Sequence, residues 1–429
     1  MTRIDMNRDG LTRRATTTLL AGAAASFAAP AVHAQSPVKL NFWDMIWGPP
    51  EYIDTAKELV TQFNREHPAV QVEYRSVPWS GWYQTYVTAI GAGSAPDIST
   101  GAGFQAVHFF EQEAILPVDD VIAEMKASGE LAEFLHGSIE TLQYKGATVA
   151  LPWALDVRAW LYRKDILEQK KIAVPTSWAE LRAAAKACTG DGVYGLISSG
   201  DTGGSHYLYN AMNNNGGGMF SPERKADILN PINVEALKLY ADMVADGSVS
   251  PASVGASSDD RRRAFTQGRC AFLLDGPGFI ASAGAAADKM GVIPPMAGPR
   301  GQKGTVYWVN NIMIYKQTRY PAQTKIFMKW WSKNQAVLWT KGNARPLPAR
   351  KSIADLPIFK SEAARLFIME NYLPIAKTLA QRASGTFPQL NEIEGEGAIM
   401  TMVQRIWQGQ DLIKSMTDAN NRLKEIIGA

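Results

Sequence analysis

Cysteine is scarce in this chain. Only Cys188 and Cys270 occur among 429 residues, which is too few for a disulfide scaffold. Whether these two join is open from the sequence, because a bridge needs Cα atoms within about 7 Å of each other. Stability must therefore come from hydrophobic cores, and a hydrophobic content of 46% is ample for them.

The chain also lacks the local motifs of metal and nucleophile chemistry. Beyond residue 34 its histidines are His67, His108, His136 and His206, and no two have the i, i+4 spacing or the nearby cysteine of a zinc site. No G-x-S-x-G, S-x-x-K or EF-hand loop occurs. We therefore expect no metal, no cofactor and no enzyme. A secreted hydrolase with an unrecognised carboxylate pair remains the alternative.

An excess of charge of either sign is missing as well. The first 34 residues hold four arginines and two aspartates, so 40 basic and 39 acidic residues remain beyond them. The run Arg261-Arg262-Arg263 is the one basic cluster, and we interpret it as a solvated helix face. Binding of nucleic acid is not expected.

What the chain does have begins with an export signal at residues 1–34. Arg13 and Arg14 precede an apolar run from Leu19 to Ala29, and small residues end at Ala34. The pair of arginines resembles a twin-arginine signal. The alternative is a membrane anchor, but an anchor needs roughly 20 apolar residues and the run from Leu19 to Ala29 is shorter. No cysteine near Ala34 could carry a lipid. We therefore predict a soluble periplasmic protein.

Hydrophobic periodicity alternates between strands and helices along the rest of the chain. Such βαβ order predicts an α/β fold with largely parallel sheets, whose ligands lie beyond the carboxyl ends of the strands. The expected strands are 38–43, 70–77, 97–100, 147–153, 193–198, 270–274 and 305–315, and the expected helices are 51–67, 82–90, 177–188, 205–213, 233–246 and 322–340. The chain from 355 onward reads as mostly helical.

Tryptophan is frequent, with 12 residues, and several stand beside polar residues at the ends of predicted strands. Trp47 follows the first strand, Trp79 and Trp82 follow the second, and Trp308 lies two residues before Asn310 on a later strand. An indole face suits the C–H face of a sugar ring, while amides and carboxylates bind its hydroxyls. This pattern favours a sugar-like ligand. Core packing is the competing interpretation, and we prefer it for Trp43, Trp160, Trp178, Trp330 and Trp331.

Several short motifs occur in a particular order. Ala95-Pro96-Asp97-Ile98 is followed by Leu151-Pro152-Trp153, then by Pro175-Thr176-Ser177-Trp178, and finally by Phe265–Phe272 with Asp275-Gly276-Pro277. This order resembles that of the family 1 extracellular solute-binding proteins of bacterial ABC importers, which include maltose-binding protein. The likeness runs over nearly the whole chain beyond residue 34.

The resemblance implies a two-lobed periplasmic binding protein fold of type II, a monomer that closes over a carbohydrate and delivers it to the permease. It places residues 35–155 plus 293–331 in an N-terminal lobe and 156–292 plus 332–429 in a C-terminal lobe. The ligand-binding positions it implies are Asp44, Trp47, Trp79, Trp82, Gly103, Phe104, Gln105, Asp156, Arg158, Gly276, Pro277, Trp308, Asn310 and Arg345.

One departure from the family bears on the ligand. An aromatic residue often follows the Asp-Gly-Pro turn, whereas Gly278 stands there in this chain. We expect a more open wall at that point. Arg158 and Arg345 could then pair with an anionic group, since guanidinium suits carboxylate, sulfonate and phosphate. The charge of the sugar therefore stays open.

Overall fold

The structure is a computed structural model that describes residues 36–135, 137–383 and 385–428. The expected export signal and His136 lie outside the described residues. Val38–Ala429 forms one compact unit. Among the described helices, none is both long enough and apolar enough to span a membrane.

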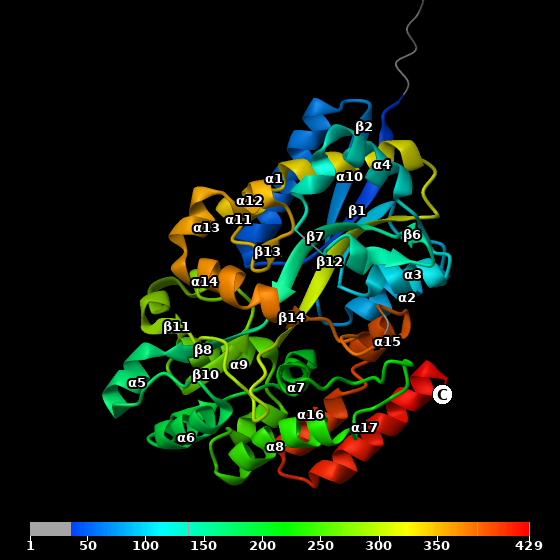
Figure 1. Ribbon diagram of the computed structural model, residues 1–429. Coiled ribbons are helices and arrows are strands. Elements are labelled where there is room, and N and C mark those ends of the chain that lie inside the picture. Colours follow the sequence, from blue (N-terminus) through cyan, green and yellow to red (C-terminus); the bar gives the residue numbers. More distant parts are fainter. Residues whose placement is uncertain (1–35, 136, 384, 429) are drawn as a thin grey trace, which may run out of the picture. The chain divides into compact units, whose positions relative to one another are not determined.

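The first sheet has the strand order β13-β7-β12-β3-β1-β2 (Figure 1). β1 runs parallel to both β2 and β3, and the long β12 runs antiparallel between β3 and β7. Two short strands, β4 and β14, pair with the two ends of β12. The strands are β1 (Val38–Met45), β2 (Val70–Val77), β3 (Ile98–Gly101), β4 (Ile115–Leu116), β7 (Leu151–Val157), β12 (Thr305–Tyr315), β13 (Leu347–Pro348) and β14 (Ala376–Lys377). A separate hairpin joins β5 (Gln143–Tyr144) to β6 (Ala147–Thr148).

Helices pack on this sheet through aromatic side chains. Phe42 of β1 contacts Phe327 and Trp331 of α10 with ring centroids 5.1 and 4.8 Å apart. The predicted helix over 322–340 is two helices, because α10 ends at Asn334 and α11 starts at Val337. The helices around the first sheet are α1 (Pro50–Glu66), α2 (Trp82–Gly91), α3 (Gln105–Glu111), α4 (Asp119–Ser128), α10 (Pro321–Asn334), α11 (Val337–Thr340), α12 (Lys351–Ala354), α13 (Pro357–Ser361) and α14 (Ala363–Asn371).

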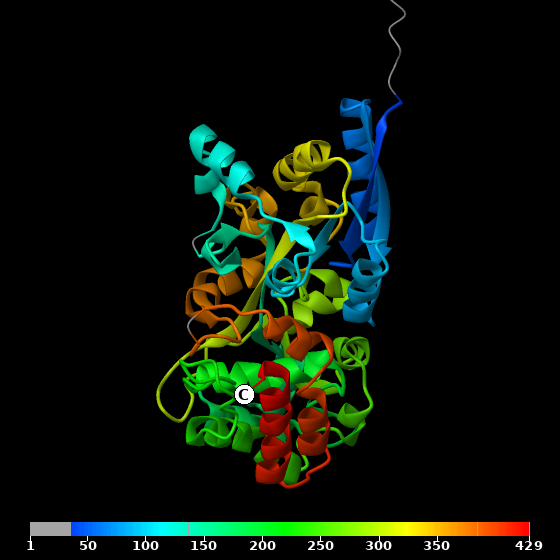
Figure 2. The same cartoon turned by 90° about the vertical axis from the view of Figure 1, so that its right-hand side faces the viewer.

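The second sheet has the order β11-β8-β10-β9, with β10 parallel to β9 and antiparallel to β8. Cys188 and Cys270 are both buried and unbridged. Figure 2 shows the C-terminal helix α17 in red alongside α16, with which it packs. The elements are β8 (Ala159–Arg163), β9 (Tyr194–Leu196), β10 (Cys270–Asp275), β11 (Met290–Val292), α5 (Lys164–Lys170), α6 (Trp178–Cys188), α7 (Thr202–Asn214), α8 (Pro231–Ala245), α9 (Ser258–Thr266), α15 (Gln389–Gly395), α16 (Met400–Trp407) and α17 (Leu412–Ile427).

We use "first lobe" and "second lobe" for the elements that pack with the first and the second sheet. The chain passes between them directly from β7 to β8, and again between β11 and β12. The expected boundary at 331 does not match the packing, because the segment up to Tyr372 belongs to the first core. Trp339 stacks on Trp153 of β7 at 5.5 Å, and Leu347 of β13 pairs with Leu155. These apolar side chains complete the first core, so the last passage comes after Tyr372.

Candidate functional site

The loop after β1 is held in place by a buried carboxylate. Asp44 has no exposed surface, and it accepts hydrogen bonds from Thr100 Oγ1 at 2.6 Å and Tyr52 OH at 2.9 Å. Tyr74 OH and Trp47 Nε1 also donate to it, both at 3.2 Å. Desolvation raises the pKa of Asp44 to about 7, although each hydrogen bond acts to lower it. Asp44 was expected to face the ligand; the structure instead occupies its oxygens with protein donors.

Three of the predicted tryptophans form one aromatic cluster. Trp47 and Trp79 meet edge to face with centroids 5.0 Å apart, and Trp82 lies 6.3 Å from Trp79. Trp153 of β7 stacks under Trp47 at 4.7 Å. Trp47 and Trp82 are buried, whereas Trp79 is 43% exposed. Its Nε1 donates to the Ile46 carbonyl at 2.8 Å, so this partly exposed indole is fixed beside the sheet edge.

The turn between β3 and α3 lies in the interior. An ideal Cβ on Gly103 would lie 3.0 Å from Trp308 Cβ, so glycine permits a close approach of the two segments. Phe104 is 1% exposed and packs with the second core, and Gln105 is fully buried. The Gln105 Oε1 accepts the Ala102 N–H at 3.0 Å. Phe104 is thus packed in a core, whereas the Gln105 Nε2 is buried without a partner among the described residues.

A second group of predicted residues surrounds Arg158. Its guanidinium forms an ion pair with Asp156, donates from Nε to His206 Nδ1 at 3.1 Å and lies 5.0 Å from the centroid of the Trp308 ring. Trp308 Nε1 in turn donates to Glu394 Oε1 at 2.7 Å. Desolvation raises the pKa of Glu394 to about 8 and holds the pKa of His206 well below its usual range. This group joins β7, β12, α7 and α15.

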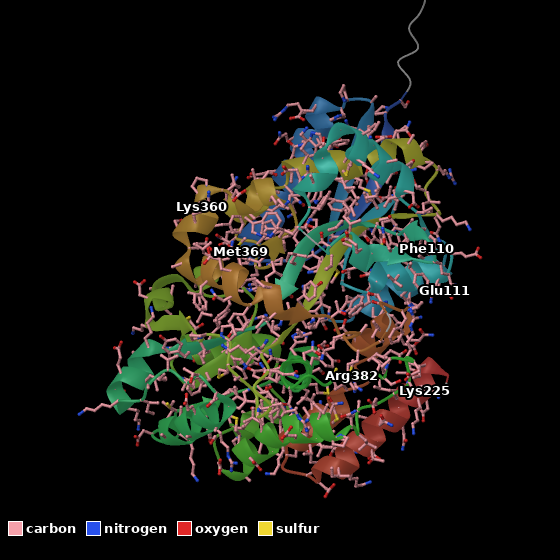
Figure 3. The ribbon with its side chains drawn as sticks, in the orientation of Figure 1. Phe110, Glu111, Lys225, Lys360, Met369 and Arg382 are labelled. Carbon is pink, nitrogen blue, oxygen red and sulfur yellow. The ribbon has the colours of Figure 1, made fainter. Side chains whose placement is uncertain are left out.

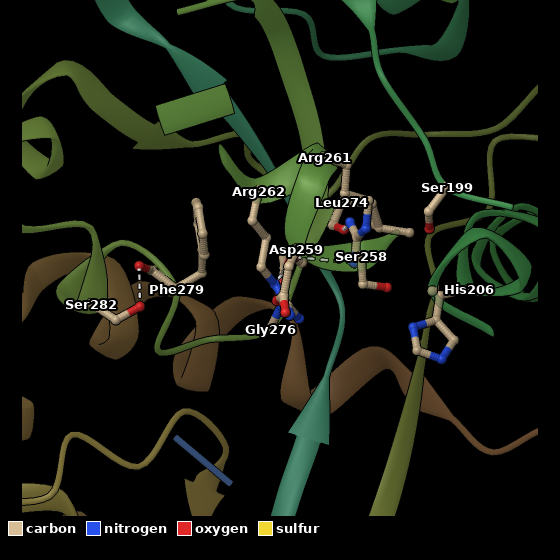
Figure 4. Close-up of polar contacts among 12 residues, drawn as sticks. Ser199, His206, Ser258, Asp259, Arg261, Arg262, Leu274, Gly276, Phe279 and Ser282 are labelled. Atoms are coloured by element: carbon tan, nitrogen blue, oxygen red, sulfur yellow. Dashed lines mark hydrogen bonds and ion pairs between the residues drawn. The ribbon is translucent and has the colours of Figure 1, made fainter. Parts of the chain in front are cut away.

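The turn after β10 carries a buried ion-pair network. Asp275 accepts two hydrogen bonds from Arg262, at 2.9 and 3.1 Å, and lies 3.2 Å from Arg261 Nη2. Burial opposes ionisation, but the charges of Arg262 and Arg261 hold the pKa of Asp275 far below its usual range. Figure 4 shows Arg262 beside Gly276. The interpretation of the arginine run as a solvated face was wrong for Arg261, which is 1% exposed.

The same turn approaches both groups of site residues. An ideal Cβ on Gly276 would lie 3.1 Å from Asp156 Oδ1, and Pro277 is buried next to it. Gly278 does not open the wall as expected, because the Arg345 carbonyl would lie 2.5 Å from a Cβ there. Arg345 is tied to the first lobe through its N–H, which donates to the Trp47 carbonyl at 3.0 Å.

Three predicted polar residues keep a buried side-chain nitrogen without a partner among the described residues: Gln105 Nε2, Asn310 Nδ2 and Arg345 Nε. Asn310 on β12 is 3% exposed and its Nδ2 has no partner among the described residues. The Arg345 Nε is likewise buried without a described partner. Desolvation, reinforced by the nearby charge of Arg262, lowers the pKa of Arg345. All three nitrogens are donors that a ligand oxygen would satisfy.

Two surface hollows lie away from these residues. The larger, of about 560 Å³, is bounded by the β5–β6 hairpin and by Thr378 and Thr386, and the smaller, of about 240 Å³, includes Glu111. Figure 3 labels Glu111 on α3. Tyr144 and Arg224 line both hollows. None of the fourteen predicted site residues lines either of them.

Residues 49–337 match the family model of the bacterial extracellular solute-binding proteins. The chain belongs to this family. The solute-binding protein is 32% identical, with a TM-score of 0.86, to a sugar transporter structure from Arthrobacter chlorophenolicus A6 with bound laminaribiose; the match covers 90% of this chain and 99% of that one. Its fold is also similar to that of maltose-bound MalE3 from T. maritima, at 22% identity and a TM-score of 0.77, over 90% and 99% of the two chains.

A curated relative is also named as a binding protein. A putative binding protein of Brucella abortus (strain 2308) is 27% identical over 316 residues, which are 72% of this chain and 75% of the relative. The α/β fold of a two-lobed binding protein, predicted from the sequence, is confirmed by these comparisons. The family and its structural neighbours are binding proteins rather than enzymes.

Sequence reasoning missed two residues of this solute-binding protein. His206 lies on α7 and Glu394 on α15, and both meet the Arg158–Trp308 pair. Neither residue belongs to a local motif, and neither comes directly after a predicted strand. The one signal that the sequence offers is an acidic residue, Glu394, placed between Ile393 and Gly395. In the structure this residue lies on α15, which packs against both lobes.

Proposed function

We propose that this solute-binding protein captures a carbohydrate between its lobes and delivers it to the permease of an ABC importer. The likeness to the laminaribiose-bound structure carries this proposal, because it extends over nearly all of both chains at 32% identity. Trp79 supports it, because its indole on the first lobe is partly exposed and held in place. Asp156 and Arg158 supply hydrogen-bonding groups of the kind that bind sugar hydroxyls.

The geometry favours capture over hydrolysis. A glycosidase needs two carboxyl groups placed on either side of a glycosidic bond. Here Glu394 is 8% exposed and its Oε1 already accepts the Trp308 N–H, while Asp156 forms an ion pair with Arg158. We propose that both carboxyl groups hold their neighbours in place, Glu394 the Trp308 ring and Asp156 the Arg158 guanidinium. The sugar then stabilises the closed form, because it binds that form more tightly than the open one.

Binding is tested by calorimetry and thermal shift with laminaribiose and maltose. We expect laminaribiose to raise the melting temperature, because a ligand at 100 times its Kd adds about 2.7 kcal/mol to the stability of the folded state. Sugar recovered after denaturation should be chemically unchanged. Absence of binding by every sugar tested would refute the carbohydrate, and release of glucose from laminaribiose would favour the hydrolase.

Cell fractionation and light scattering test the remaining parts of the proposal. We propose that the export signal sends the protein to the periplasm as a monomer. Replacing Arg13 and Arg14 with lysine should then leave the protein in the cytoplasm, if the signal is of the twin-arginine type. Export of the double variant at the normal level would show that a different route is used.

A further inference from the structure

A glycine stands where the second lobe meets the first. An ideal Cβ on Gly278 would lie 2.5 Å from Arg345 O, 2.7 Å from Arg345 Cα and 2.7 Å from Arg365 Nη2. Separations under 3.0 Å are not found for real Cβ atoms, and two of these three neighbours are backbone. No side chain fits at position 278 in this arrangement.

The two sides of this contact are anchored in different lobes. Arg345 is bonded to the Trp47 carbonyl, and Arg365 of α14 donates from Nη2 to the Ala344 carbonyl at 3.4 Å. Gly278 continues into Phe279 and Ile280, which pack in a core cluster with residues of β8 and β10. We call the contact of Gly278 with Arg345 and Arg365 the glycine seam.

Space, and not backbone conformation, is what glycine provides at this seam. Glycine also serves positions with a positive φ, but Gly278 is not among the positive-φ glycines of the described chain. An alanine could therefore adopt its backbone angles. Its methyl group would nevertheless overlap the Arg345 backbone, which cannot rotate away as the end of a side chain can.

We propose that Gly278 sets how closely the two lobes approach, and so sets affinity for the solute without touching it. This inference rests on the proposed binding function. We take the described arrangement, in which Gly278 lies against the Arg345 backbone, as the closed form. A Cβ at position 278 would then penalise closure, and the ligand could stabilise the closed form only by overcoming that penalty. Overpacking of this kind lowers apparent affinity by about tenfold or more.

The test compares Gly278→Ala with Gly255→Ala. Gly255 also has an ordinary φ, of −109°, and a Cβ there meets no atom within 4 Å, so its alanine variant controls for the loss of a glycine. Calorimetry with laminaribiose gives the affinity of each variant. We expect Gly278→Ala to bind at least about tenfold more weakly and Gly255→Ala to match the wild type.

Spin labels report the lobes directly, with and without the sugar. Lys57→Cys in α1 and Gln169→Cys in α5 place exposed labels on the two lobes, and the native cysteines are buried. We expect Gly278→Ala to lose the short-distance population that the wild type shows. A urea titration without sugar should give the same midpoint for both proteins, because the open form has no overlap at the seam.

Three outcomes overturn the inference. They are equal affinity and equal distances for Gly278→Ala and wild type, a loss of stability without sugar at unchanged distances, and a wild type that shows no short-distance population in either condition. Failure of the proposed function has a different signature: wild-type protein that populates the short distance but binds no sugar.

Discussion

Truncating Trp79 to alanine should weaken sugar binding strongly and change stability little. A buried tryptophan removes roughly 150–250 Å² from water, and Trp79 is 43% exposed, so at most about 110 Å² of its surface is available to a ligand. At about 25 cal/mol per Å² this surface is worth about 1.5–2.7 kcal/mol of binding free energy. We therefore expect Kd to rise between tenfold and hundredfold.

Calorimetry with laminaribiose checks this value against two further variants. Trp79→Phe keeps an aromatic face but loses the hydrogen bond to Ile46, so it should retain most of the affinity. Trp330→Ala removes a tryptophan from the α1–α10 contact, where Trp330 bonds to Glu66, and should leave affinity unchanged. An unaltered Kd for Trp79→Ala would refute the stacking argument. If Trp330→Ala lost as much affinity as Trp79→Ala, the loss would reflect a change in stability alone.

Three further predictions concern stability. Asp275→Asn leaves the buried Arg261 and the half-buried Arg262 without their carboxylate and should cost about 3–5 kcal/mol in urea unfolding. Glu73→Gln, in an exposed pair, should cost almost nothing. Because the pKa of Glu394 is raised to about 8 from 4.5, the folded state keeps a proton that the unfolded state releases. Stability should therefore fall as pH rises from about 5 to 8, and Glu394→Gln should flatten that dependence. Asp44→Asn should flatten it between about pH 4 and 7, and an unchanged pH profile in either variant would contradict the argument.

The fold could be predicted because its signals are local. Alternating strands at 38–43 and 70–77 and the helix between them appear as β1, β2 and α1 within a few residues. The tryptophans at strand ends were found for a related reason, since the carboxyl ends of β1 and β2 lie at one edge of the parallel pair. Trp47 and Trp79 accordingly meet, although Trp79 lies 32 positions after Trp47 in the chain.

Features that depend on distant segments could not be predicted. Gly278 suggested an open wall because the sequence does not show that Arg345 passes beside it. His206 and Glu394 reach the site from helices whose positions depend on the packing of both cores. The assignment of 332–372 to the second lobe failed for the same reason, because Trp339 finds its partner Trp153 far back in the chain.

The predicted positions differ in the hydrogen-bonding capacity that they have left for a ligand, and their place in the sequence does not show this difference. A hydroxyl that reached Asp44 would have to displace Thr100 or Tyr52 from oxygens they already occupy, and would leave a buried donor unpaired. A ligand oxygen at Asn310 or Arg345 would instead satisfy a buried donor that has no described partner. A ligand oxygen therefore gains binding free energy at Asn310 and Arg345, whereas a ligand hydroxyl loses it at Asp44. Specific recognition of the solute should accordingly depend on Asn310 and Arg345, while Asp44 holds Trp47 in place for the stacking face next to it.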